Sequence, residues 1–255
     1  MAIIIKSDKE IEILRESGKR LAHVLDEVEK AVRPGISTKE LDAIAQDVVK
    51  KLGDTAPFLG YQPYGADFPY PGAICLSVND EIVHGLPKER ILKEGDIIGL
   101  DMGVSHQKMI TDSARTIAVG KVSEKAQKLI DVTKEALKVG ITAARAGAHV
   151  GDIGCAIEHF VRPFKYGIVR ELGGHGVGRE VHEDPYIPNF GTKKGVGAKL
   201  KPGMVIAIEP MLNEGKRGIV LDNDGYTYRT ADRSLSAHFE HTVLITKDGP
   251  EILTI

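Results

Sequence analysis

The chain has 255 residues, 42% of them hydrophobic and 27% charged, a composition that is typical of a globular protein and excludes a largely disordered one. Its 34 Lys and Arg residues nearly balance its 36 Asp and Glu residues, so the net charge is −2 and we predict no sequence-specific binding of nucleic acid. Its two cysteines are too few for a disulfide scaffold or a four-cysteine zinc site.

The N-terminal residues do not resemble a targeting segment. The apolar run at positions 2–5 ends at Lys6, and it is too short for the hydrophobic core of a signal peptide. No stretch approaches the ~20 apolar residues that a membrane-spanning helix needs. We therefore expect a cytoplasmic protein without membrane contact.

Two helices are predicted in the first half of the chain. Ser7 and Glu10 form an S-x-x-E capping box, and apolar residues follow it at helical spacing. Ser37 and Glu40 form a second box before another helix. We expect that helix to end near Gly53, because glycine readily adopts the left-handed conformation found at helix ends.

The second half of the chain repeats this order. Helical stretches are expected after Ser123 and after Gly147, and in both halves short strand-like runs with polar residues follow the helices. Residues 92–101 (LKEGDIIGLD) resemble residues 200–209 (LKPGMVIAIE) at an offset of 108 residues. Such a match alone can arise by chance, but the common order of elements indicates a duplicated α+β unit.

We predict one domain over residues 1–255, built from pseudo-symmetric halves of about 1–120 and 121–255. No Pro-, Gly- and Ser-rich linker separates the halves, so we expect them to pack together. Two halves related by a pseudo-two-fold axis would face each other. Equivalent residues of the two halves would then converge on one central site.

Acidic residues recur at equivalent places in the two halves. Asp101 and Glu209 end the two repeated segments, and Asp112 and Glu240 each precede a run of β-forming residues. Asp101 and Asp112 are close enough in sequence for neighbouring strands of a hairpin. Buried carboxylates are costly unless something neutralises them, and four in one place would repel one another. Cations would resolve this conflict.

His175 is the imidazole that best completes this acidic set. It lies in the sequence GGHG, whose glycines we expect to let the backbone approach a metal or a substrate closely. Any one of these acids or histidines alone is more often structural. Their joint pattern, however, matches a two-metal site with oxygen and nitrogen ligands.

Two further histidines are related by the repeat. His84 in VHGLP and His182 in VHEDP need not be ligands, and could donate hydrogen bonds to a substrate amide or to a tetrahedral intermediate. His106, His238 and His241 flank the site segments and could support the groups that act there.

Together, these motifs resemble those of the type I methionine aminopeptidases of metallopeptidase family M24, in their short bacterial form. The resemblance covers nearly the whole chain and is carried by VNDEIVHGLP, GDIIGLDMGV, TDSART, GGHGVGREVHEDP, PGMVIAIEPM and DRSLSAHFEHTVLIT. It implies the pita-bread (creatinase/aminopeptidase-like) fold. That fold is α+β and duplicated, with a curved antiparallel sheet, helices on its outer face and pseudo-two-fold symmetry.

The resemblance also implies roles for the converging residues. Two divalent metal ions per chain, either Co, Mn, Fe or Zn, would be held by five ligands: Asp101, Asp112, His175, Glu209 and Glu240. His84 and His182 would bind the scissile amide and its transition state. Glu209 would also transfer the proton.

The implied reaction is removal of the initiator methionine from nascent proteins, preferably when the second residue is small. Metal-activated water would attack the first peptide bond. The methionine pocket would be formed by Cys75, Tyr61, Tyr70 and Tyr226. The segment 61–75 is longer than in the usual bacterial form, so the pocket is the part of the site that the resemblance defines least.

Two other functions remain open from the sequence. An X-Pro aminopeptidase on the same fold is disfavoured because the chain lacks the separate N-terminal domain of those enzymes. A non-catalytic binding protein with this fold is disfavoured because all five implied ligands are retained.

The implied partners are N-terminal Met peptides of nascent proteins, and a monomer is expected. Because nascent chains emerge from the ribosome, the ribosome surface is a candidate partner as well. Lys6, Lys9, Lys19 and Arg20 could contact it. We favour the simpler interpretation that these four residues form a solvated helix face.

Overall fold

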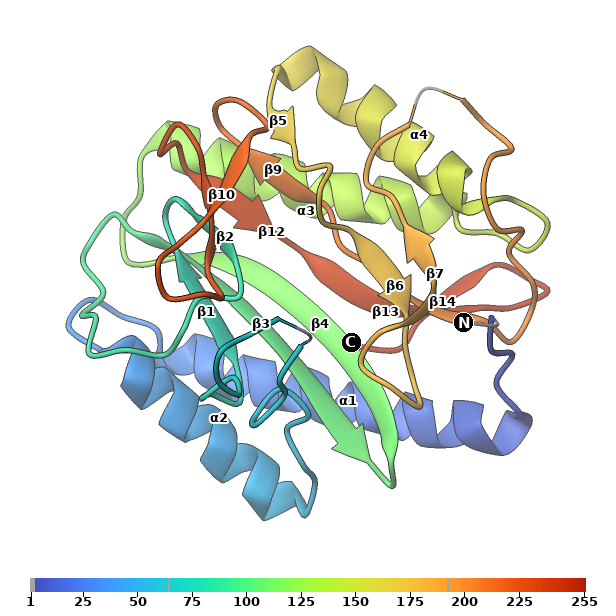
Figure 1. Cartoon of the computed structure of the whole chain (residues 1–255), viewed down its shortest axis with the longest axis horizontal. Coiled ribbons are helices and arrows are strands. Elements are labelled where there is room, and N and C mark those ends of the chain that lie inside the picture. The colour runs from blue at the N-terminus through green and yellow to red at the C-terminus, as the bar shows by residue number, and fades with distance from the viewer. Residues whose placement is uncertain (1–2, 64, 192) are drawn as a thin grey trace.

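The computed structural model describes residues 3–63, 65–191 and 193–255, which form helices packed on a curved antiparallel sheet (Figure 1). Helix α1 (Asp8–Ala31) begins at the predicted capping box, where the Ser7 hydroxyl accepts the Glu10 N–H and the Glu10 carboxylate accepts the Ser7 N–H. Helix α2 (Thr38–Leu52) begins at the second box and ends at Gly53, which is left-handed as predicted.

The main sheet has three equivalent strands on each side of its middle, and β7 is added at one edge. Its strand order is β1–β3–β4–β13–β8–β6–β7, with β14 paired to β13. Strands β1, β3 and β4 come from the first half, and β6, β8 and β13 come in the same order from the second. This confirms the predicted duplication. The strands are β1 (Cys75–Val78), β3 (Ile97–His106), β4 (Met109–Ala118), β6 (Gly174–Gly176), β7 (Glu183–Ile187), β8 (Val205–Ile208), β13 (Glu240–Ile245) and β14 (Pro250–Ile252).

Each half of the sheet shares a core with its own pair of helices. Helices α1 and α2 bury their apolar faces with residues of β1 and β3. Helices α3 (Glu124–Ala143) and α4 (Val150–Val161) do the same with residues of β8 and β13, and a short 3-10 helix (Arg162–Phe164) extends α4. Figure 1 shows the two helix pairs along opposite halves of the sheet. Among the described residues, no helix combines the length and the apolar character that crossing a membrane requires.

Two small sheets stand beside the main one. The first has the order β10–β11–β2 and the second β12–β9–β5. Strand β2 carries His84 directly after its last residue, so the first small sheet helps to place that histidine. The six strands are β2 (Glu81–Val83), β5 (Gly167–Ile168), β9 (Met211–Asn213), β10 (Ile219–Leu221), β11 (Tyr228–Thr230) and β12 (Ser236–His238).

The interpretation of Lys6 as part of a solvated helix face is wrong. Lys6 precedes α1, and its side chain is fully buried in an ion pair with Glu183. The burial has a physical reason, because the paired carboxylate replaces the water that a lysine otherwise requires. Lys9 and Lys19 are exposed, as this interpretation expects, whereas Arg20 is half-buried and pairs with Glu16 and Asp54.

Candidate metal centre

Strand register brings three of the predicted ligands to one face of the sheet. In the β3–β4 hairpin Asp101 lies opposite Ala114, and Ala114 lies opposite Glu240 at the start of β13. Directly opposed residues of antiparallel strands point to the same face. Asp112 lies two residues before Ala114 on β4 and joins them, because side chains alternate along a strand. The prediction that Asp101 and Asp112 lie on one hairpin is confirmed.

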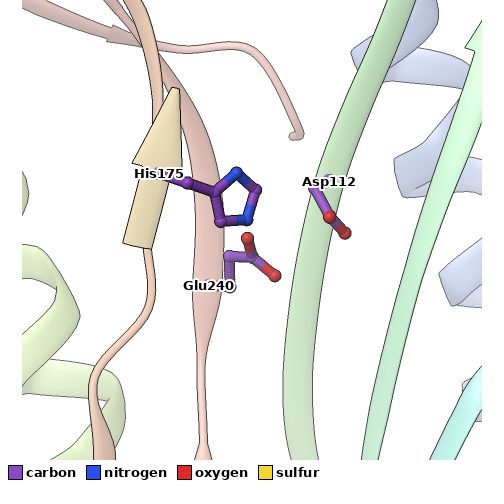
Figure 2. A group of neighbouring side chains, drawn as sticks. All are labelled: Asp112, His175 and Glu240. Atoms are coloured by element: carbon purple, nitrogen blue, oxygen red, sulfur yellow. The ribbon is translucent and has the colours of Figure 1, made fainter. Parts of the chain in front are cut away.

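The second half contributes His175 and Glu209. His175 is the middle residue of β6, and Glu209 directly follows β8. His175 Nε2 lies 3.5 Å from Glu209 Oε1. Asp112, His175 and Glu240 offer ligand atoms that all lie within 4.8 Å of one another, and Figure 2 shows these side chains converging from three strands.

The glycines beside His175 allow strands, rather than a ligand, to come close. A Cβ on Gly174 would lie 2.2 Å from the carbonyl oxygen of Ala207 on β8, and one on Gly176 would lie 2.4 Å from that of Asp184 on β7. No side chain fits at such distances. We expected these glycines to serve a metal or a substrate. The structure shows that they let β6 pack tightly between its neighbours, which fixes the backbone of His175.

The clustered carboxyl groups lie in a buried site, and their pKa values are raised above those of exposed carboxyl groups. Burial raises the pKa of Asp112 to about 7, and burial with the neighbouring Asp112 raises the pKa of Glu209 to about 8. Burial and nearby carboxylates hold the pKa values of Asp101 and Glu240 well above their usual range. Asp112 Oδ1 and Glu240 Oε1 are buried without a hydrogen-bond partner among the described residues. Such oxygens require a cation or a donor.

This donor set fits a divalent cation. The carboxylates supply oxygen ligands and negative charge, and His175 supplies a nitrogen. Burial, with His182 nearby, lowers the pKa of His175 to about 3, so its imidazole is neutral, which is the form that binds metals. Mixed oxygen and nitrogen sites of this kind suit Mn, Fe, Co and Zn.

His84 and His182 lie beside the acidic cluster. The rings of His182 and His175 meet edge to face, with their centroids 4.5 Å apart. Burial, with His182 nearby, lowers the pKa of His84 to about 4, and partial desolvation at the cavity mouth lowers that of His182. Both rings are therefore neutral near pH 7 and can each donate one hydrogen bond. His84 has a φ of 58°, an uncommon left-handed conformation that is often found at functional sites.

One cavity of about 270 Å³ brings the predicted site residues together. The acidic cluster and the histidines form one part of its wall. Tyr70, Cys75 and Tyr226 pack against one another as a buried apolar group in another part. The full set of predicted residues in the wall is Tyr61, Tyr70, Cys75, His84, Asp101, Asp112, His175, His182, Glu209, Tyr226 and Glu240.

His238 also lines this cavity, although the sequence indicated only that it flanks the site. Its side chain is 3% exposed, and its Nε2 has no hydrogen-bond partner among the described residues and lies 3.6 Å from Glu209 Oε2. Its place two residues before Glu240, in extended chain, was a signal that could have found it. His106 and His241 instead bond to an aspartate and a threonine and do not line the cavity.

Comparisons with known proteins agree with this geometry. Residues 12–247 match metallopeptidase family M24. The methionine aminopeptidase of Aquifex aeolicus is 48% identical over 258 residues, which are 100% of this chain and 99% of that protein.

Solved structures give the same result. The methionine aminopeptidase from Rickettsia prowazekii matches with a TM-score of 0.95 at 38% identity, over 100% of both chains. That from Thermotoga maritima matches with a TM-score of 0.93 at 42% identity, over 99% of both chains. The predicted pita-bread fold is thereby confirmed, and the chain belongs to the methionine aminopeptidases of metallopeptidase family M24.

Proposed function

We propose that the chain removes the N-terminal methionine from nascent proteins, preferably when the second residue is small, with the help of two divalent ions. The observation that carries this proposal is the convergence of clustered carboxylates with a neutral imidazole in the wall of a partly apolar cavity, where two buried carboxylate oxygens, Asp112 Oδ1 and Glu240 Oε1, have no hydrogen-bond partner among the described residues. Membership of the family supports the reaction class. Because the substrates would be nascent proteins, we infer that the reaction takes place in the cytoplasm.

The proposed ligands come from both halves of the chain. Asp101 and Asp112 from the first half would hold the ions together with His175, Glu209 and Glu240 from the second. Bound there, divalent ions would neutralise the clustered carboxylates and supply a nucleophile from water near neutral pH. The donor types accept Co, Mn, Fe or Zn, so the supply in the cell would select among them.

Three side chains of the cavity wall would transfer the proton of the attacking water and stabilise the negative charge that develops on the substrate. Glu209 adjoins both the ligand cluster and the space for a peptide, so its carboxylate would take the proton of the attacking water and pass it to the leaving amine. His84 and His182 would donate hydrogen bonds to the scissile amide as its carbonyl oxygen gains negative charge. Their neutral rings suit that task.

The apolar part of the cavity would bind the methionine side chain. Tyr70, Cys75 and Tyr226 offer a buried surface of aromatic rings and a thiol, which suits an unbranched, polarisable thioether. Tyr61 would cover it from the exposed segment above. The free α-amine of the substrate would face the acidic cluster, which would restrict cleavage to the first residue.

The test is release of free methionine from Met-Ala-Ser, compared with Met-Lys-Ser and Leu-Ala-Ser. Chelator-treated protein is assayed alone and after addition of Mn(II), Fe(II), Co(II) or Zn(II), and metal content is measured in parallel. We expect metal-dependent cleavage of Met-Ala-Ser only, with two ions bound per chain at full activity. No cleavage with any ion, in folded protein, would refute the proposal.

A further inference from the structure

A buried ion pair links the N-terminus of the chain to the loop that carries His182. Lys6 Nζ donates to Glu183 Oε2 at 2.5 Å, and the two side chains are 0% and 4% exposed. The Lys6 backbone is also fixed, since its N–H donates to the Gly203 carbonyl at 2.8 Å. A buried ion pair adds little to net stability because both charges lose their water, so another role for this one is worth testing.

Glu183 organises the backbone of the loop before it. Its second oxygen, Oε1, accepts the N–H of Arg179 at 2.6 Å and that of Glu180 at 3.3 Å. Hydrogen bonds from backbone N–H groups to an ionised carboxylate are among the stronger ones in proteins. Lys6 therefore neutralises one oxygen of Glu183 while the other gathers residues 179–183 around it.

The stem of Lys6 also packs against the backbone of this loop. A Cβ on Gly178 would lie 2.3 Å from Lys6 Cε, so the lysine stem packs directly against that backbone. The Gly178 carbonyl accepts the Ile110 N–H at 2.6 Å, which ties the loop to β4 two residues from Asp112. The lysine thus fills the space between the loop and the strand that carries a proposed ligand.

Among the described residues, His182 has few polar contacts to orient it. Its ring is exposed at the cavity mouth, and the hydrogen bond that its Nδ1 makes within this part of the chain is a long one of 3.5 Å with the Tyr61 hydroxyl. The backbone at the neighbouring residue, Glu183, is by contrast anchored by buried, charged groups. The position of the His182 ring therefore depends on the loop.

We propose that the Lys6–Glu183 pair positions His182 for the reaction, so that Lys6 is a positioning residue although it lies outside the cavity wall. This inference rests on the proposed function, in which His182 donates to the scissile amide. Without Lys6, Glu183 becomes a lone buried carboxylate that must take up a proton or admit water. Either change loosens the bonds to Arg179 and Glu180 and displaces the ring of His182.

The test compares Lys6→Met with two other variants in steady-state cleavage of Met-Ala-Ser. We expect K6M to lower kcat about 10- to 100-fold, as for a misplaced catalytic group, with a smaller change in KM. Arg15→Met is the matched control, because Arg15 lies in α1 and forms an exposed ion pair with Glu251. R15M should keep wild-type kinetics.

The third variant separates positioning from stability. Removing Lys6 alone leaves a buried charge, which costs stability, whereas K6M/E183Q removes both charges and should recover the Tm. We expect its kcat to stay low, because the charged anchor of the loop is gone. Wild-type kcat in K6M/E183Q would overturn the proposal.

A double-mutant cycle with His182→Ala identifies the residue through which Lys6 acts. We expect H182A to lower kcat about 100-fold or more, and K6M to have little further effect in that background. A full K6M effect in H182A would overturn the positioning role. Wild-type activity of H182A would refute the role of His182 in the proposed function, whereas an inactive H182A with a fully active K6M would refute this inference alone.

Discussion

His238 gives a quantitative test of the metal-centre geometry. Its buried Nε2 has no hydrogen-bond partner among the described residues and lies 3.6 Å from Glu209 Oε2, so a small shift of the carboxylate on metal binding would let the imidazole donate a hydrogen bond to it. His238→Met removes the N–H and keeps an apolar side chain of similar reach. A hydrogen bond to a charged group contributes about 1.5–3 kcal/mol. At 1.4 kcal/mol per factor of ten, divalent ions should bind about 10- to 100-fold more weakly, the range seen when the support of a metal ligand is lost.

Calorimetric titration of metal-free protein with Mn(II) measures this change without relying on activity. His238→Gln is the matched control, because glutamine still offers an N–H at the same place. We expect H238Q to bind Mn(II) nearly as well as the wild type and H238M to bind it more weakly. Equal affinities for H238M and wild type, at unchanged Tm, would refute a role for His238 in holding Glu209 in the metal-bound form.

Three other predictions concern stability and the pocket. Metal-free D112N should have a higher Tm than the metal-free wild type, because one buried carboxylate of the cluster is gone. Mn(II) should raise the Tm of D112N less than it raises that of the wild type, and thermal unfolding with and without Mn(II) checks both. Hydrogen bonds from Arg179 and then Ser7 lower the pKa of Glu10 from 4.5 to about 2. The ionised Glu10 therefore adds its full contribution to the free energy of unfolding above pH 4.5, and this contribution is lost as the pH falls toward 2. At pH 7, E10Q should therefore have a free energy of unfolding about 1–2 kcal/mol lower than the wild type, after allowance for the exposed Arg179. Urea unfolding measures this difference, and a difference that persists near pH 2 would contradict the prediction. Y226F loses the hydroxyl that donates to the Phe68 carbonyl and so helps to hold the segment over the pocket. KM for Met-Ala-Ser should rise about fivefold at similar kcat, and an unchanged KM would count against this role.

Local sequence signals predicted much of the fold because they depend on nearby residues. The Ser7 and Ser37 capping boxes fix the starts of α1 and α2 through bonds that span three residues. The repeated segments that end in Asp101 and Glu209 reflect the duplicated order of the strands. Spacing alone also suggested the β3–β4 hairpin, since a short connection favours antiparallel neighbours.

The features that the sequence did not predict depend on partners far along the chain. Lys6 pairs with a residue 177 positions later, and an isolated lysine normally indicates solvent. The glycines around His175 were linked to a ligand, because the neighbouring strands that actually require them are not evident from the motif. The place of His238 before Glu240 pointed to the site, but its approach to Glu209 depends on the register of two separate sheets, which the sequence does not give.

The meeting of β4 and β13 has a consequence for how the two halves hold together. Asp101 and Asp112 lie on one side of this seam, and His175, Glu209 and Glu240 lie on the other. The proposed ligand set is therefore complete only when β4 and β13 are paired, so bound ions would stabilise the contact between the two halves. A ligand that binds only the closed form at 100 times its Kd adds about 2.7 kcal/mol of stability. Separation of β4 from β13 should accordingly be slower when metal is bound, so the ions that the two halves would hold together would in turn stabilise the contact between the halves.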